Sequence, residues 1–238
     1  MGMFFEEHAK LLSDFARVSQ AAGARADYVQ GGGGNTSVKL PGGLMAIKAS
    51  GFCLSDIRPD KAYAVLDGAD LRNFYLTTEP SALADVEKEG SARAKADIRH
   101  IDGLADLRPS VEAGFHSILK TFVVHTHSVY ANLAACSTAC RPIAAQAFAG
   151  ANYTWGWVPY TDPGANLTFA IRDELRRVEK ETGKVPSVIL MQNHGIIVHD
   201  DDPDTALAIH TDANERLARM FGLSGTSFPK IAVREMAA

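Results

Sequence analysis

The sequence predicts a single soluble globular domain of the α/β class that spans residues 1–238. A chain of 238 residues can bury a sizeable core, and α/β domains of this length are common. Hydrophobic residues make up 46% and charged residues 22%, which argues against a disordered, fibrous or membrane protein. Segments with helical spacing of apolar residues alternate with short strand-like runs, and no linker or internal repeat divides them.

The first half of the chain predicts one amphipathic helix and several short antiparallel strands. Apolar residues recur at helical spacing from residue 4 to 22, and Gly23 is the expected C-cap. Residues 77–107 are polar and predict no definite element. Turn residues alternating with β-like runs predict strands over 37–40, 44–48 and 62–66, followed by a short helix over 68–75.

The second half predicts a helix that leads into a buried strand, followed by further helices and one more strand. After Pro109 a helical pattern leads into Phe122-Val123-Val124, an apolar run that ends directly on His125. A Gly/Trp/Pro-rich stretch over 150–164 predicts a loop. The remaining elements are helices over 129–139, over 166–182 and after Asp204, and a strand over 188–191.

Charge, cysteine content and hydropathy exclude several classes of protein. A net charge of -4 with scattered signs leaves no basic stripe for a nucleic acid. Three cysteines without a CxxC pair indicate neither a disulfide framework nor a structural zinc site, so we expect reduced thiols in a cytoplasmic protein. The first residues lack a long apolar segment, and no later run is long enough to cross a bilayer. We therefore expect neither export nor a membrane partner.

Three histidines follow strand-like runs and predict a metal site. His125 and His127 lie two residues apart where a strand ends, so both imidazoles are expected on one face. His194 comes shortly after the apolar run VILM, and Gly195 allows the chain to turn sharply there. Converging neutral imidazoles suit a divalent ion. The alternative is a surface histidine pair and a separate histidine in a capping turn.

Glu112 is the carboxylate best placed to act beside these histidines. It lies one helical turn before His116, at the start of the helix that leads to His125. A carboxylate there can stay ionised and either complete a metal shell or move a proton; the alternative is a glutamate that only complements the helix dipole. We expect His116 to pack within its helix. The other histidines are expected to be solvated or structural: His8, His100, His199 and His210.

Two glycine-containing turns together predict an anion site. The run Gly31 to Gly34 precedes Asn35, Thr36 and Ser37, so bare backbone amides and hydroxyls can surround a phosphate or a carboxylate. The turn Lys48-Ala49-Ser50-Gly51 offers a hydroxyl, an amide and a cation to the same anion. Neither the Walker nor the dinucleotide-binding spacing is present. Each turn alone is more often a tight loop, but the two together favour binding.

Taken in chain order, the motifs GGGGNTS, KASG, PSVE, VVHTHS, VPYTDPG and NHGIIV resemble the class II aldolase/adducin family. The resemblance extends from about Tyr28 to the final helix. The sequences GGGGNTSVK and IKASG are most similar to the aldolase part of bifunctional rhamnulose-phosphate aldolase/dehydrogenases. We therefore expect a free-standing aldolase-type domain without the dehydrogenase half.

The resemblance implies a three-layer α/β/α sandwich with a mainly antiparallel central sheet, in a homotetramer with sites at the subunit borders. It implies that His125, His127 and His194 are the metal ligands and that Glu112 is the acid/base carboxylate. Tyr160 matches a tyrosine that assists protonation at the aldehyde end of the substrate. The positions that match phosphate-binding residues of fuculose-phosphate aldolase are Gly34, Asn35, Ser50, Gly51 and Ser110.

The activity that the resemblance implies is metal-dependent cleavage of a ketose or ketose phosphate through a metal-stabilised enediolate. Zn²⁺ is the expected ion, with Mn²⁺, Co²⁺ or Fe²⁺ as alternatives, and the metal replaces any need for Lys48 as a Schiff-base nucleophile. Val111 stands where fuculose-phosphate aldolase has a second serine, which weakens the expected grip on a phosphate.

Several alternatives use the same metal site. They are decarboxylation of a 3-oxo sugar-acid phosphate, epimerisation of a pentulose phosphate and oxygenation by bound Fe²⁺. Epimerisation is disfavoured because, by this resemblance, the epimerase branch of the family has an aspartate at the position of Glu112. From a different class, a non-catalytic adducin-like interaction domain is least favoured, because adducin-type domains have lost the histidines that are all intact here.

Overall fold

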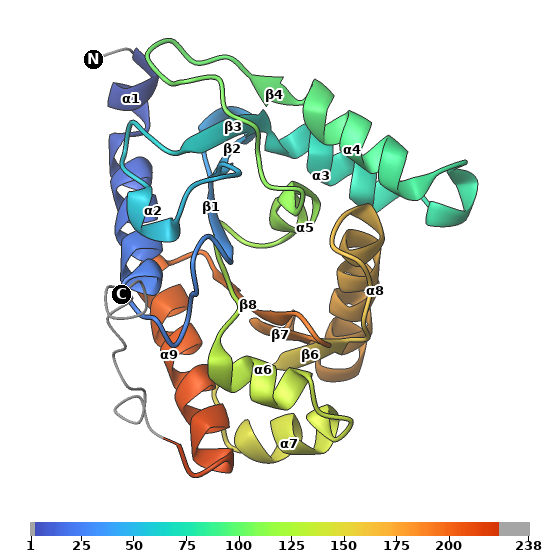
Figure 1. Cartoon of the computed structure of the whole chain (residues 1–238). Coiled ribbons are helices and arrows are strands. Elements are labelled where there is room, and N and C mark those ends of the chain that lie inside the picture. The colour runs from blue at the N-terminus through green and yellow to red at the C-terminus, as the bar shows by residue number, and fades with distance from the viewer. Residues whose placement is uncertain (1–2, 224–238) are drawn as a thin grey trace, which may run out of the picture.

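The structure, a computed structural model, describes residues 3–223 and shows one sheet of eight strands between two layers of helices (Figure 1). The strand order is β4-β3-β2-β1-β5-β8-β7-β6, and all neighbours are antiparallel except β6 and β7, which are parallel. The strands are β1 Asn35–Lys39, β2 Leu44–Lys48, β3 Tyr63–Asp67, β4 Ile98–Arg99, β5 Phe122–Thr126, β6 Trp155–Val158, β7 Val188–Met191 and β8 Gly195–Asp200. The predicted α/β fold with a mainly antiparallel sheet is confirmed.

One helical layer packs against the face of the sheet that carries Phe122 and Val124. These two side chains share a buried cluster with Phe15 of the long N-terminal helix, and Val198 of the next strand continues the same face toward the C-terminal helix. Alternate residues of a strand point to opposite faces, so Val123 lies in the other core. The helices of this layer are α1 Met3–Glu7, α2 Ala9–Gly23, α6 Val129–Ala135, α7 Cys140–Ala147 and α9 Pro203–Met220.

The second helical layer covers the Val123 face. Its core joins Val123 and Ile197 of the sheet to Phe115 and Phe169 of two helices. This layer comprises α3 Gly68–Thr77, α4 Val86–Ala96, α5 Ala113–Ile118 and α8 Ala165–Thr182. The short α5 leads directly into β5, so that the residues at its start lie close to the end of the central strands.

Some boundaries and elements differ from the sequence-based predictions. The helix predicted over 4–22 is interrupted at His8, and Gly23 lies inside α2 rather than capping it. The helix predicted over 129–139 ends at Ala135. The predicted loop over 150–164 contains β6, whose Gly156 leaves room for the Glu174 side chain of α8. Strand β8 and helix α4 were also not predicted.

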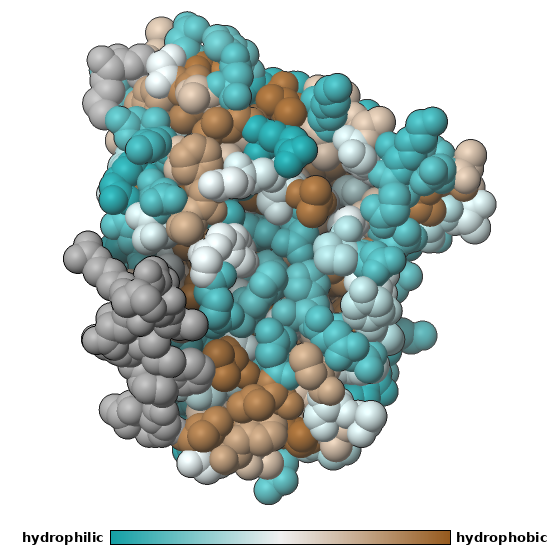
Figure 2. All heavy atoms as spheres, viewed as in Figure 1, coloured by the Kyte–Doolittle hydropathy of each residue, from teal (hydrophilic) through white to brown (hydrophobic). Residues whose placement is uncertain are grey.

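The surface of the described residues is mixed in hydropathy. Figure 2 shows hydrophilic residues in the middle of this view and hydrophobic residues gathered over α6 and α7. Among residues 3–223 no helix combines the length and the apolar character that crossing a membrane requires. A single domain over the full range 1–238 stays a prediction.

Candidate metal centre

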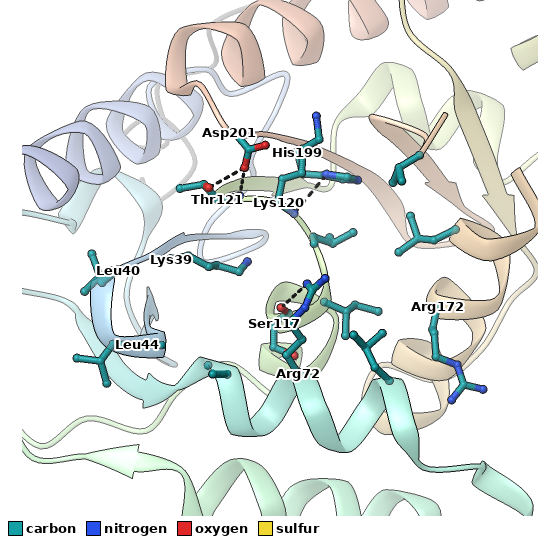
Figure 3. Close-up of a pocket in the computed structure, with 18 of the residues that line it drawn as sticks. Lys39, Leu40, Leu44, Arg72, Ser117, Lys120, Thr121, Arg172, His199 and Asp201 are labelled. Atoms are coloured by element: carbon teal, nitrogen blue, oxygen red, sulfur yellow. Dashed lines mark hydrogen bonds between the residues drawn. The ribbon is translucent and has the colours of Figure 1, made fainter. Parts of the chain in front are cut away.

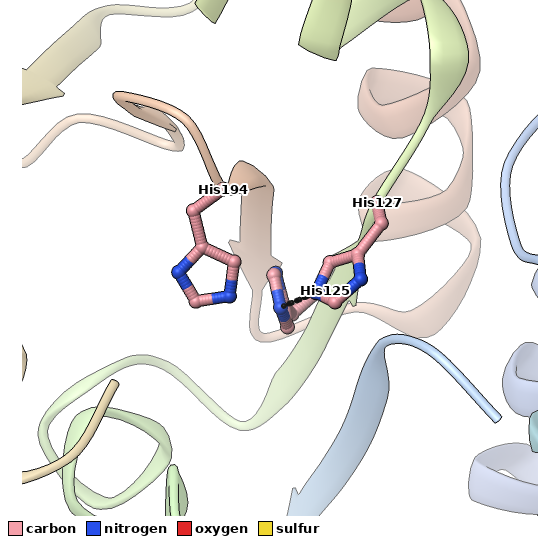
Figure 4. A group of neighbouring side chains, drawn as sticks. All are labelled: His125, His127 and His194. Atoms are coloured by element: carbon pink, nitrogen blue, oxygen red, sulfur yellow. Dashed lines mark hydrogen bonds between the residues drawn. The ribbon is translucent and has the colours of Figure 1, made fainter. Parts of the chain in front are cut away.

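Three histidine side chains meet at one end of β5, although two separate strand ends supply them (Figure 4). His125 is in β5, His127 follows just after it, and His194 lies in the turn between β7 and β8. The Nε2 atoms of His125 and His127 are 3.1 Å apart. Potential ligand atoms of all three residues lie within 4.8 Å of one another. His125 is buried while His127 and His194 are half-buried, so one side of the cluster is open to a ligand.

The protonation of these rings suits a cation. Nδ1–H of His125 donates to the carbonyl of Ile196 at 3.0 Å, which leaves a lone pair on the Nε2 that faces His127. Burial lowers the pKa of His125 to about 3 and also lowers the pKa of His127, so both rings are neutral at neutral pH. A carbonyl that orients a ligating imidazole is a usual feature of metal sites. The three-histidine donor set therefore fits a divalent metal ion.

Glu112 lies against this cluster as a buried carboxylate. Its Oε1 is 3.0 Å from Nε2 of His194, and its Oε2 is 3.7 Å from Nε2 of His125. Burial acts to raise the pKa of Glu112, but the imidazoles of His125 and His194 and hydrogen bonds from His194 and Asn35 more than offset it. The pKa of this carboxyl therefore lies well below its usual range. Glu112 is thus a charged group that can accept a proton beside the histidines.

A buried chain of hydrogen bonds, which the sequence did not predict, supports Glu112 from behind. Nδ2 of Asn35 donates to Oε2 of Glu112 and, at 3.1 Å, to Oγ of Ser110. Oδ1 of Asn35 accepts from Nε2 of His116, and Nδ1 of His116 accepts from Oγ of Ser37 at 2.8 Å. Burial lowers the pKa of His116 well below its usual value, which keeps the ring neutral. His116 therefore does more than pack within its helix.

The two predicted glycine turns lie next to each other. Nζ of the buried Lys48 donates to the carbonyl of Phe52 at 2.7 Å and to that of Gly32 at 3.5 Å, which ties one turn to the other. Gly34 has a φ of +71°, and a Cβ there would lie 2.6 Å from the carbonyl oxygen of His125. Glycine at this position therefore lets β1 approach the histidine-bearing end of β5.

The remaining predicted phosphate contacts border the same region. Ser50 donates from its Oγ to the carbonyl of Pro109 at 3.1 Å and from its amide to that of Arg108 at 2.9 Å, which places this turn beside Ser110. Gly51 is exposed and has a φ of +88°. Val111, at the position of the missing serine, is 69% exposed.

Tyr160 is not part of this cluster in the described chain. Its side chain is 55% exposed, and its hydroxyl donates to Oδ1 of Asp162 at 2.8 Å. Its amide donates to Oε1 of Gln192 at 3.0 Å, which holds the backbone close to the turn that carries His194. Among residues 3–223 the hydroxyl makes no hydrogen bond to the histidines or to Glu112.

A cavity of about 780 Å³ begins beside Ser110. Val111 and Gly114 line it on one side, and α4, from the polar segment that the sequence left unassigned, lines another. Two of its basic side chains, Lys95 and Arg108, form no ion pair with any residue in the range 3–223. The cavity thus extends from the neighbourhood of Glu112 towards a partly basic wall.

The other histidines are not part of the cluster. His8, His199 and His210 are buried, and His100 is exposed and bonded to Asp106 at 2.8 Å. Oγ1 of Thr126 bonds to Nε2 of His210 at 2.7 Å, a contact behind the strand end.

Comparisons with solved structures support the fold. The N-terminal class II aldolase domain of a conserved protein from Thermoplasma acidophilum is 20% identical with a TM-score of 0.71, over 88% of this chain and 93% of that chain. YgbL from Klebsiella pneumoniae is 17% identical with a TM-score of 0.61, over 99% of both chains. L-fuculose-1-phosphate aldolase from Thermus thermophilus is 15% identical with a TM-score of 0.54, over 90% of this chain and 95% of that chain.

No curated protein sequence matches this chain. In contrast, the family described as class II aldolase and adducin N-terminal domain matches residues 13–221, which include every member of the histidine cluster and Glu112. The chain therefore belongs to the class II aldolase and adducin N-terminal domain family.

Proposed function

We propose that this protein is a metal-dependent aldolase that cleaves a ketose or a ketose phosphate. The observation that carries the proposal is the contact of a charged, buried Glu112 with a cluster of three imidazoles. Nitrogen donors in this number suit Zn²⁺ best, and Mn²⁺, Co²⁺ or Fe²⁺ can also use them. Adducin-like interaction domains do not need such a cluster.

Glu112 moves the proton in the proposed reaction. Its carboxylate is ionised, lies within hydrogen-bond reach of the cluster and is held in one orientation by Asn35. It takes up a proton that the substrate releases and returns that proton to the nucleophilic carbon after the carbon–carbon bond breaks. A bound divalent ion supplies Lewis-acid charge that stabilises the enediolate left by carbon–carbon cleavage.

The substrate body is proposed to lie along the cavity beside Ser110. Asn35, Ser50 and Ser110 offer polar groups near Glu112, while Lys95 and Arg108 offer positive charge farther along. A phosphate or a sugar-acid carboxylate held by these two cations would compensate for the hydroxyl that Val111 lacks.

We further propose that Tyr160 serves the active site of a neighbouring subunit in a homotetramer. Its exposed side chain supports this arrangement, because a hydroxyl that is bonded to Asp162 and not to its own cluster can reach another copy. The same observation favours a second candidate, decarboxylation of a 3-oxo sugar-acid phosphate, since that reaction needs no acid at an aldehyde end.

The test is a panel of ketose phosphates, free ketoses and 3-oxo sugar-acid phosphates, each assayed with the zinc-loaded protein and again with a chelator. We expect chelator-sensitive release of an aldehyde from at least one ketose or ketose phosphate. Release of carbon dioxide alone would replace the aldolase by the decarboxylase. A protein that neither binds zinc after dialysis nor cleaves any substrate would instead fit an interaction domain.

The matched variant for this assay is Glu112→Gln. It keeps the size of the side chain but removes the proton acceptor, so we expect turnover to fall by about 10²- to 10⁴-fold with zinc still bound. Unchanged turnover in a zinc-loaded Glu112→Gln protein would contradict the role of Glu112.

A further inference from the structure

A second cavity lies at the opposite end of the central strands from the histidines (Figure 3). It has a volume of about 640 Å³ and lies between α3, α8 and the segment that joins α5 to β5. Thr121 borders it, four residues before His125 along β5, so a strand rise of ~3.3 Å per residue separates the two regions by about 13 Å. The metal centre and its substrate cavity do not share this space.

The cavity wall is strongly basic in a chain whose net charge is -4. Three of its basic residues already have acidic partners: Lys120 pairs with Asp200 at 2.9 Å, and Arg172 and Arg176 pair with Asp173 at 2.9 Å and 4.0 Å. The basic lining residues are Lys39, Arg72, Lys120, Arg172 and Arg176, and the acidic ones are Glu179 and Asp201.

Lys39 and Arg72 are the cations of this wall without an acidic partner. Neither forms an ion pair within the part of the chain that the structure describes, residues 3–223. Nζ of Lys39 donates to the carbonyl of His116, and Nη1 of Arg72 donates to that of Ser117 at 3.3 Å. The carboxylate of Asp201 accepts hydrogen bonds from Thr121. Figure 3 shows the Lys39 and Arg72 side chains directed towards each other across the cavity, while the Arg172 guanidinium points away.

The side chains of the half-buried Lys39 and the exposed Arg72 are directed towards each other, and neither forms an ion pair within residues 3–223, so together they favour a negatively charged ligand. Burial first, and then the charge of Arg72, lower the pKa of Lys39 to about 7, while the charge of Asp201 acts in the opposite direction. An anion that enters the cavity stabilises the charged form of Lys39, because it attracts the ammonium group and screens its repulsion from Arg72. Carbonyl tethers hold both side chains in place, so little ordering is needed when the anion binds.

The rest of the wall defines the body of the ligand. It is mostly aliphatic, with Ser117, Thr121 and His199 as its neutral polar members, and the aliphatic residues are Leu40, Leu44, Leu76, Ile118, Leu119, Leu175 and Val185. We propose that this cavity binds a small organic anion whose carboxylate or phosphate lies between Lys39 and Arg72 and whose body packs on the aliphatic wall. This is a ligand site separate from the candidate metal centre.

The experiment is isothermal titration of the full chain with three probes: inorganic phosphate, hexanoate and hexyl phosphate. We expect saturable binding of one equivalent of at least one hexyl-bearing probe, tighter than inorganic phosphate. Comparison of hexanoate with hexyl phosphate then shows which anionic group the cavity prefers. Arg72→Gln should weaken this binding by about ten-fold, the effect of losing one charged hydrogen bond.

Matched variants keep the test decisive. Lys180→Gln removes the same charge from an exposed position of α8 outside the cavity and should leave binding unchanged. Lys39→Met provides a second disruption, and thermal melting checks that each variant is folded. No saturable binding of any probe would overturn the proposal, and so would binding that Arg72→Gln and Lys39→Met both leave unchanged.

Discussion

The two ends of the central strands β1 and β5 carry opposite chemistry. At one end, Asn35 and His125 are paired across the ladder, and the imidazoles of His125 and His194 contact the ionised carboxylate of Glu112. At the other end, Lys39 and Arg72 are directed towards each other across a cavity whose wall has more basic than acidic residues. Lone pairs and negative charge suit a cation, whereas unpaired ammonium and guanidinium groups suit an anion. One sheet can therefore hold two ligands of opposite charge a few residues apart.

The largest expected effect is on zinc affinity at the histidine cluster. His194→Ala removes one of three donors, so we expect zinc affinity to fall by more than about 100-fold, because even loss of an outer-shell partner costs about 10- to 100-fold. Competition with a chelating dye measures the affinity. His100→Ala, which removes an exposed histidine outside the cluster, should leave the affinity unchanged. Equal zinc affinity in His194→Ala and the parent would disprove the three-histidine site.

The next effect concerns the support of Glu112. His116→Leu breaks the hydrogen bond that orients Asn35, so kcat in the retro-aldol assay should fall by about 10- to 100-fold with KM and zinc content unchanged. His116→Gln can still donate to Asn35 and should recover part of the loss. In a double-mutant cycle, His116→Leu and Asn35→Ala should be non-additive because they act through one contact. Additive losses would indicate that His116 has only a structural role.

The site residues whose positions follow from a local sequence pattern could be predicted. His125 and His127 follow an unbroken apolar strand, and His194 follows another, so strand periodicity alone brought them to strand ends. Glu112 could be singled out by its position at a helix start ahead of the histidine-bearing strand, whereas its acid/base role came from the family resemblance. Neither route identified the contact between Asn35 and His116, which are 81 residues apart.

Elements that rely on tertiary contacts were not predictable in the same way. Helix α4 buries only Gly90 and therefore shows no apolar face. Its position depends instead on Glu87, whose carboxylate accepts hydrogen bonds from the Ala165 and Asn166 amides at the start of α8. The cavity around Lys39 and Arg72 joins segments that are distant in sequence, so no motif marks it.

A smaller effect separates two glycines of one turn. Gly34→Ala should reduce the free energy of unfolding by about 2–4 kcal/mol, since a left-handed φ and a clash with the His125 carbonyl both oppose a Cβ. Gly31 has a φ of +58° but open space around its Cβ position, so Gly31→Ala should cost only about 1 kcal/mol. Urea denaturation measures both. Equal costs would show that contact with β5 does not require glycine at position 34.

The smallest expected effect is on the pH dependence of stability and concerns His199, which lines the cavity around Lys39 and Arg72. Burial first, and then the charges of Lys39 and Lys120, lower the pKa of His199 to about 3 from its ordinary value of 6.5. Between these values the unfolded chain binds a proton that the folded chain does not, so stability falls as the pH falls from about 6.5 towards 3. From about pH 7 to 5, the parent should lose about 2 kcal/mol more than His199→Gln in urea denaturation.

His100 supplies a control of opposite sign for this measurement. Its hydrogen bond to Asp106 raises the pKa of His100, so the folded chain binds the proton more tightly than the unfolded chain. His100→Gln should therefore make the loss of stability on acidification steeper, while His199→Gln makes it shallower. Identical slopes for the parent and His199→Gln would mean that His199 accepts a proton in the folded state. In that case the basic end would be far better solvated than its burial indicates, and its demand for an anion would be correspondingly weaker.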